Sequence, residues 1–241
     1  MDLVSAKAMR RSLGRGYARQ ALQAAQDGSA DMARLMTDLH GLAPNARSHS
    51  RFARRLARRR GVLRAAPSGR GLRVLARCVL DVTVCKDGTA CFREARVCWT
   101  RIDALARRGR ISFTLTGVQV SRHAMQRRAE RSDCFLRTLL ADMDIQMCAA
   151  LDHLRRCAPI KDRGDAFLPA SDGVWAGGTE SMSVPCGWGA AFAGSSPPLN
   201  VFAIRTFLGE AEMRPTVWLA WSGTRAAPDR DAPLQPTRSA A

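Results

Sequence analysis

The hydrophobic pattern of the chain changes its period near residue 72, and this change constrains the fold more than any other feature of the sequence. Before this point, apolar residues recur at helical spacing in three segments, residues 3–26, 31–40 and 50–60. After it, β-branched and other apolar residues partly alternate with polar ones, over residues 72–84 and 110–120. The pattern therefore predicts helices in the first third of the chain and strands after them.

The rest of the chain adds two helices and further strands to this prediction. Ser121 is a suitable N-cap for a helix over residues 122–131, and a strongly apolar helix is expected over residues 133–156. Further strands are expected at residues 89–100, 181–193 and 199–208. Residues 102–107 are predicted as a short helix or turn, residues 61–71 as a linker and residues 158–178 as a loop.

Together these segments predict an α+β domain over residues 71–222, in which a small antiparallel sheet packs with two helices. A basic helical segment, residues 1–70, precedes this domain, and residues 223–241 form a disordered tail rich in Pro, Ala and Arg. Hydrophobic residues make up 46% of the 241, which is enough to bury a core. No run of about 18 apolar residues occurs, so we expect no membrane span. The first 26 residues lack the apolar block of a secretory signal, so we expect a cytoplasmic protein.

Positive charge is concentrated at the start of the chain. The first 77 residues hold 17 Lys and Arg against 4 Asp and Glu, a net charge of +13 out of +17 for the whole chain. Only three of the basic residues are lysines, a bias typical of a GC-rich bacterial genome, but this bias does not explain the shortage of acids. A polyanion such as RNA or DNA is the natural partner of such a segment.

The densest basic stretch is a ten-residue segment of the third predicted helix. Its arginines are Arg51, Arg54, Arg55, Arg58, Arg59 and Arg60. Each is able to meet a phosphate, which predicts steep salt dependence of binding. Phe52 is the only aromatic residue there, so we expect contacts to the backbone of a nucleic acid rather than reading of its bases. A solvated basic helix, or a helix that docks on a partner protein, fits the same residues.

A second group of residues suits phosphate chemistry. If Ser121 is the N-cap, His123 lies in the first turn of its helix, where the helix dipole favours the neutral imidazole. Arg127 and Arg131 follow four and eight residues later, near the same helix face. A histidine moves protons and an arginine holds phosphate. An ordinary surface helix, with its arginines paired to nearby acids, fits these residues equally.

This segment resembles metal-independent ribonucleases and toxin-like proteins of the barnase–EndoU–colicin–RelE group, over residues 110–132 and 199–208. In that group a strand leads into a helix that begins with His-Ala and carries later arginines, and a later strand ends in Thr or Ser. The resemblance implies catalytic roles for His123, Arg127, Arg131, Arg205 and Thr206, and RNA cleavage by transesterification without a metal or cofactor. The long helix over residues 133–156 departs from that pattern.

The eight cysteines do not predict a metal site. None forms a C-x-x-C pair, and the four histidines do not complete a zinc spacing. Four of the cysteines, Cys78, Cys85, Cys91 and Cys98, recur at intervals of 7, 6 and 7 residues. This spacing is compatible with a disulfide cluster, but without a secretion signal we favour free, buried cysteines.

Two functions are therefore predicted. The first is a nucleic-acid-associated, ribonuclease-like toxin domain. The second is a non-catalytic nucleic-acid-binding or assembly protein that uses the arginine-rich N-terminal segment, with a protein partner docking on its N-terminal helices.

Overall fold

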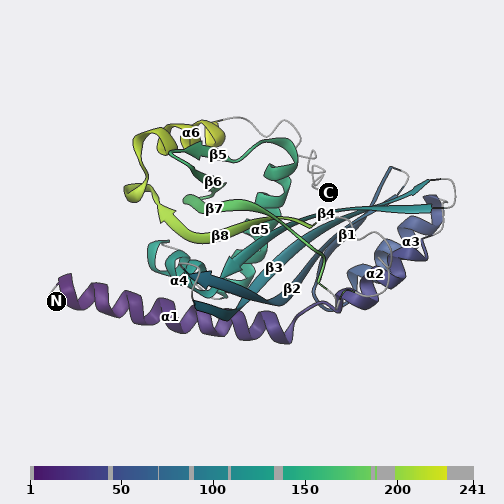
Figure 1. Ribbon diagram of the computed structural model, residues 1–241, viewed down its shortest axis with the longest axis horizontal. Coiled ribbons are helices and arrows are strands. Elements are labelled where there is room, and N and C mark those ends of the chain that lie inside the picture. The colour runs from purple at the N-terminus through teal and green to yellow at the C-terminus, as the bar shows by residue number, and fades with distance from the viewer. Residues whose placement is uncertain are drawn as a thin grey trace, which may run out of the picture.

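The computed structural model describes residues 3–42, 46–69, 71–86, 90–107, 110–132, 138–185, 188 and 199–226. These residues form six α-helices and eight β-strands (Figure 1). The helices are α1 (Leu3–Asp27), α2 (Met32–His40), α3 (Ala46–Ala57), α4 (Arg122–Arg131), α5 (Leu139–Arg156) and α6 (Pro215–Ala226). The strands are β1 (Val62–Ser68), β2 (Gly71–Lys86), β3 (Ala90–Arg107), β4 (Arg110–Ser121), β5 (Ile160–Asp162), β6 (Asp165–Ala170), β7 (Gly173–Met182) and β8 (Leu199–Gly209).

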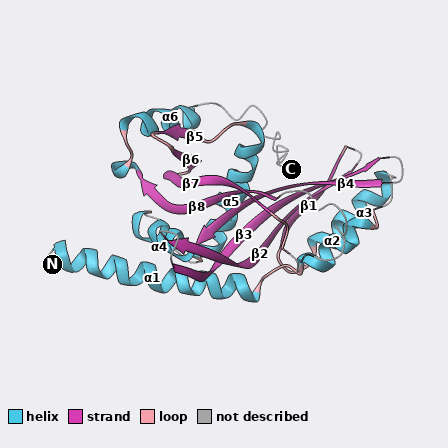
Figure 2. Ribbon diagram, in the orientation of Figure 1, coloured by secondary structure: helices cyan, strands magenta, loops and turns pink. Residues whose placement is uncertain are grey.

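All eight strands belong to one curled sheet, in the order β1-β2-β3-β4-β8-β7-β6-β5 (Figure 2). Every neighbouring pair is antiparallel except β4 and β8, which are parallel, so the sheet is mixed. The prediction of a small antiparallel sheet packed with two helices is therefore wrong. The sheet is larger because segments predicted as linker and loop are strands. Residues 61–71 contain β1, and residues 158–178 contain β5, β6 and part of β7.

The missed strands carry weak local signals. β1 ends on Pro67 and Ser68, β5 has three residues, and β7 contains adjacent glycines, Gly177 and Gly178. Pro and Gly are depleted in strands, so pattern reading assigns such segments to loops. The structure also replaces the predicted short helix at residues 102–107 by the end of β3, which pairs with β4 as far as Arg107.

The remaining predicted elements are confirmed more closely. The alternating pattern of residues 72–84 and 110–120 corresponds to β2 and β4, and residues 199–208 to β8. The three N-terminal helices and α4 form where predicted, and α5 ends at Arg156 as expected. The predicted start of that helix at Asp133 lies outside the described residues. α6 extends to Ala226, into the segment predicted as a tail, of which residues 227–241 lie outside the described part of the chain.

Helices cover both faces of the sheet. α1, α4 and α5 pack on one face, where the core includes Val97, Trp99 and Val118. α2 and α3 pack on the other, against Leu72, Val74 and neighbouring residues. At the far end of the sheet, α6 packs on Phe167 and Val174, whereas their neighbours Leu168 and Trp175 belong to the core under α5. Because successive strand residues face opposite ways, α6 and α5 lie on opposite sides.

The N-terminal helix is anchored only by its second half. Ala18, Ala21 and Ala25 of α1 are buried against the core, and Gly14 lets the helix approach α4 closely. A Cβ at Gly14 would lie 2.8 Å from Cγ of Glu130, which requires that side chain to move. The first half of α1 projects beyond the rest of the molecule (Figure 1). Met9 and Leu13, on that half, are about half exposed.

Among the described residues, no helix combines the length and the apolar character needed to cross a bilayer.

Candidate nucleic-acid interface

α3 exposes most of its arginines because it buries a different side of the helix. Ala53 and Leu56 are buried against β1 and β2 in the core of that sheet face. Arg51, Arg54 and Arg55 are spaced three and four residues apart, so they share a face of the helix, and all three are exposed. Arg58 and Arg60, in the turn after α3, are also exposed.

Two of these six arginines have partners within the described part of the chain. Arg59, which is half-buried, forms an ion pair with Asp38 of α2. The guanidinium of Arg55 lies 4.6 Å from the centre of the Phe52 ring, a cation–π contact. Arg51, Arg54, Arg58 and Arg60 have no acidic partner among the described residues. The helix therefore presents guanidinium groups whose charge the fold itself does not neutralise.

The surface suits phosphate groups better than bases. An exposed guanidinium offers donors in a planar fork that matches phosphate oxygens. Phe52 is half-buried and already covered by Arg55, so it does not form a free platform for stacking a base.

The second predicted site begins as the sequence indicates. Ser121, the last residue of β4, is the N-cap of α4, and its hydroxyl accepts a hydrogen bond of 3.1 Å from the amide of Ala124. The N-cap prediction is therefore confirmed. His123 lies in the first turn and is exposed.

The other residues predicted for this site are held by their own partners. Nη1 of Arg127 lies 2.6 Å from Oε2 of Glu130. The guanidinium of Arg131 donates to the carbonyl of Phe207 and forms an ion pair with Glu212. Burial, and next the positive charge of Arg127, lowers the pKa of Arg131. At a rise of about 1.5 Å per residue, Arg131 and His123 are about 12 Å apart along the helix axis.

β8 supplies the last two predicted residues. Arg205 is exposed at a bulge of β8, and its guanidinium lies beside Gly178 of β7. Thr206 is half-buried opposite Ala176. The structure brings the end of β8 to Arg131, because Phe207 is the next residue after Thr206. No hydrogen bond or ion pair joins His123 to any of the other four residues within the described ranges.

One arginine of α4 is central to the structure and was not predicted. Arg128 is completely buried and pairs with Asp142 of α5 and with Asp172. Its guanidinium lies 4.8 Å from the centre of the Phe207 ring. Burial alone would lower the pKa of Arg128, but hydrogen bonds from the two carboxylates outweigh it and the pKa is raised. Nothing in the local sequence distinguishes Arg128 from Arg127, since only the packing of α4 on β8 and α5 buries it.

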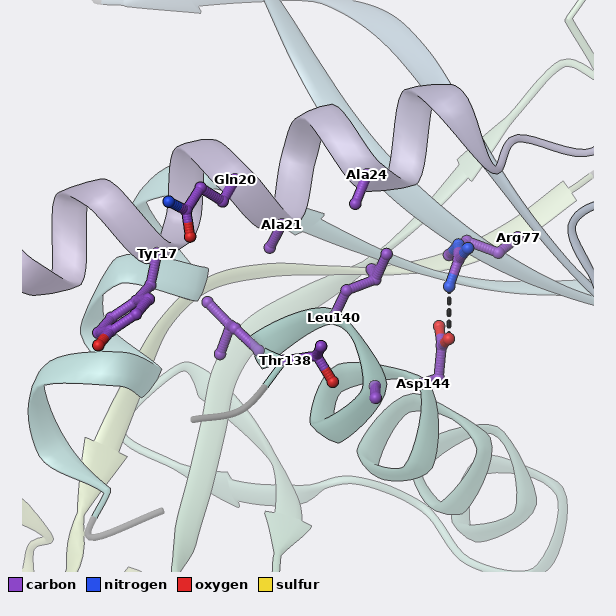
Figure 3. Close-up of a pocket in the computed structure, with 10 residues that line it drawn as sticks. Tyr17, Gln20, Ala21, Ala24, Arg77, Thr138, Leu140 and Asp144 are labelled. Atoms are coloured by element: carbon purple, nitrogen blue, oxygen red, sulfur yellow. Dashed lines mark hydrogen bonds and ion pairs between the residues drawn. The ribbon is translucent and has the colours of Figure 1, made fainter. Parts of the chain in front are cut away.

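A cavity of about 480 Å³ lies between α1 and α5 (Figure 3). Its wall is mostly apolar, with Ala21, Ala24 and Leu140 facing it. An ion pair between Arg77 and Asp144 closes one end, and Nε1 of Trp99 donates to Asp144 at 2.8 Å. These charged groups satisfy one another, so they lock α5 onto the sheet rather than offer a reactive group.

The cysteines pair across β2 and β3. Cys78 lies opposite Cys98, and Cys85 opposite Cys91, because the intervals of 7, 6 and 7 are symmetric about the turn between these strands. Cys78 and Cys98 are free and buried, as predicted. For Cys91 the prediction is wrong, since this residue is disulfide-bonded. The side chain of Cys85 and all of Cys134 and Cys186 lie outside the described parts.

Comparison with known proteins adds no assignment. No family model, no curated protein and no solved structure matches the chain. The function must therefore be argued from the geometry. Within the described ranges, no three His, Cys, Asp or Glu side chains lie close enough to hold a metal ion together.

Proposed function

We propose that the protein binds nucleic acid through the phosphate backbone, with α3 and the turn after it as the contact surface. The observation that supports this is the exposed row of arginines on α3, four of which have no acidic partner among the described residues. Like charges on neighbouring turns of a helix repel one another and destabilise it. A bound polyanion relieves this repulsion.

The proposal concerns backbone binding, so it predicts little preference for sequence. Phosphate contacts fix the position of a protein on a nucleic acid but carry no sequence information directly. The exposed arginines are not interleaved with free aromatic side chains, so base stacking adds little. RNA and DNA are both candidate ligands.

The test is the salt dependence of binding. The logarithm of the binding constant falls with the logarithm of salt concentration, with a slope of about −0.9 for each phosphate neutralised on duplex DNA and about −0.7 on single strands. In a variant with Gln at Arg51, Arg54, Arg55 and Arg58, we expect the slope on duplex DNA to become smaller by about 3 to 4. Fluorescence anisotropy with labelled RNA and DNA measures this.

A matched control removes the same charge from another exposed helix. Arg10, Arg11, Arg15 and Arg19 of α1 are all exposed, and a variant with Gln at these positions loses four charges as well. We expect its slope to change by less than one. Equal slopes for wild type and the α3 variant would refute the proposal. An equal loss in both variants would mean that overall charge, rather than α3, drives binding.

The ribonuclease function stays a prediction. Its residues on α4 and β8 are not joined by contacts in the described structure, and Arg127 and Arg131 are engaged with Glu130 and Glu212. We therefore place the proposal on α3, which requires no catalytic constellation.

A further inference from the structure

Five arginines from three strands and one helix meet at a second place in the fold. Arg64 of β1, Arg73 of β2 and Arg101 of β3 line a cavity of about 230 Å³, together with Arg155 and Arg156 from the last turn of α5. The remaining wall is formed by Ala66, Pro67, Leu75 and Asp152.

The sheet register explains why arginines far apart in sequence gather here. Leu75 is the Cα partner of both Arg64 and Arg101, so these three residues form one row across β1, β2 and β3. Residues paired in this way point to the same face of a sheet, and Arg73, two positions before Leu75, points there too. This is the face that carries α5, whose C-terminal turn adds the other two arginines.

The acids near the cavity do not balance its charge. Asp103 accepts hydrogen bonds from Nε of Arg73 at 2.8 Å and from Nε of Arg101 at 2.7 Å. Burial alone would raise the pKa of Asp103, but these two arginines outweigh it and hold the pKa below its usual value. Asp152 is the other acid, so five guanidinium groups face two carboxylates. The C-terminal carbonyls of α5 attract Arg155 and Arg156 but do not account for the three arginines on strands.

Arg101 carries the strongest sign of an incomplete site. Its side chain is only 5% exposed, and its Nη1 atom is buried without a hydrogen bond. The atom lies 3.6 Å from Oδ1 of Asp152, too far for a hydrogen bond. A buried donor without a partner is costly, so an anion that satisfies it would bind favourably.

A neighbouring cavity shares Arg155 and Arg156 with the first. It measures about 470 Å³ and is lined by polar side chains from three strands, Thr116, Thr179 and Asn200. Hydroxyl and amide groups donate and accept hydrogen bonds, so this space suits an uncharged polar group rather than a second phosphate.

We propose that the five-arginine cavity binds the phosphate group of a small phosphate monoester, whose attached polar group occupies the neighbouring cavity. A phosphate monoester carries a charge of about −1.5 to −2 at neutral pH, which fits a surplus of three positive charges. Arginine binds such oxygens in a bidentate manner. The cavity is smaller than the 300 Å³ or more typical of a site for a whole drug-sized ligand, so it takes the phosphate alone.

This inference does not depend on nucleic-acid binding by α3. The α3 helix packs on Leu72 and Val74, on the sheet face opposite the one that Leu75 and the cavity share. Loss of one function by mutation therefore leaves the other measurable.

Isothermal titration of the full chain at pH 7.5 and low salt tests the site, with inorganic phosphate, adenosine 5′-monophosphate and adenosine as probes. We expect both phosphates to bind with a dissociation constant of about 1 mM or lower, the monoester more tightly, and adenosine not to bind. Adenosine binding as tightly as its monophosphate, or no binding of either phosphate, would overturn the proposal. Equal affinity of the two phosphates would overturn the role of the neighbouring cavity.

Variants place the site. The exposed arginines Arg64 and Arg155 are replaced together by Gln, and we expect binding of the monoester to weaken at least tenfold. A control with Gln at Arg10 and Arg11 of α1 loses the same charge and should bind unchanged. Equal weakening in both would overturn the assignment to this cavity. Arg101→Gln should abolish binding, with circular dichroism to establish that the variant is folded. If it does not fold, the Arg64 and Arg155 pair alone decides.

Discussion

Replacement of Arg128 by Met tests whether the buried ion pairs of α4 hold the helix layer on the sheet. The guanidinium has no exposed surface, contacts Asp142 through Nε at 3.1 Å, pairs with Asp172 and lies on the Phe207 ring. Met has a similar length and helix propensity, so the change removes charge and hydrogen bonds with little loss of packing. It leaves two carboxylates without their partner.

The expected cost follows from the exposure of those carboxylates. Removing one partner of a fully buried ion pair costs about 3–5 kcal/mol. Here the side chains of Asp142 and Asp172 are 21% and 37% exposed, so water solvates them in part once the arginine is gone. We therefore expect Arg128→Met to lower the free energy of unfolding by about 2–4 kcal/mol.

Urea denaturation followed by tryptophan fluorescence measures this free energy by linear extrapolation. The control is Arg122→Met, the same substitution at an exposed position of the same helix, for which we expect a change within about 0.5 kcal/mol. A variant of Arg128→Met that also carries Asp142→Asn and Asp172→Asn should recover stability, because no unpaired charge remains. Equal stability of Arg128→Met and Arg122→Met would refute the reasoning.

Two further predictions concern thiol and catalytic chemistry. Burial, then the charges of Asp144 and Asp152, raises the pKa of Cys148 to about 11, so at pH 8 iodoacetamide should modify the exposed Cys157 and leave Cys148 unmodified until the pH approaches 11. Mass spectrometry of the native protein checks this, and labelling of Cys148 first would contradict it. If the ribonuclease prediction holds, the protein cleaves RNA in EDTA and His123→Ala does so at least 100-fold more slowly. Equal rates, or no cleavage by wild type, would dismiss it.

The elements that depend on neighbouring residues were readable from the sequence. Apolar residues at helical spacing located α1, α2 and α3, and the hydroxyl of Ser121 marked the start of α4, because helix periodicity and capping involve residues only a few positions apart. Alternation located β2 and β4 for the same reason. The exposed arginines of α3 also followed from sequence, since Ala53 and Leu56 had to face the core.

Strand pairing and charge burial were decided by the tertiary structure alone. β4 and β8 are parallel partners separated by the whole segment from α4 to β7, so no local pattern records their contact. The same holds for Arg64 and Arg101, which become neighbours only because Leu75 lies between them in register. Arg127 and Arg128 are adjacent and chemically identical, yet one is solvated and the other buried between two carboxylates. Sequence therefore determined where charge and periodicity lie along the chain, and the sheet determined which arginines meet, because register brings together side chains that are distant along the backbone.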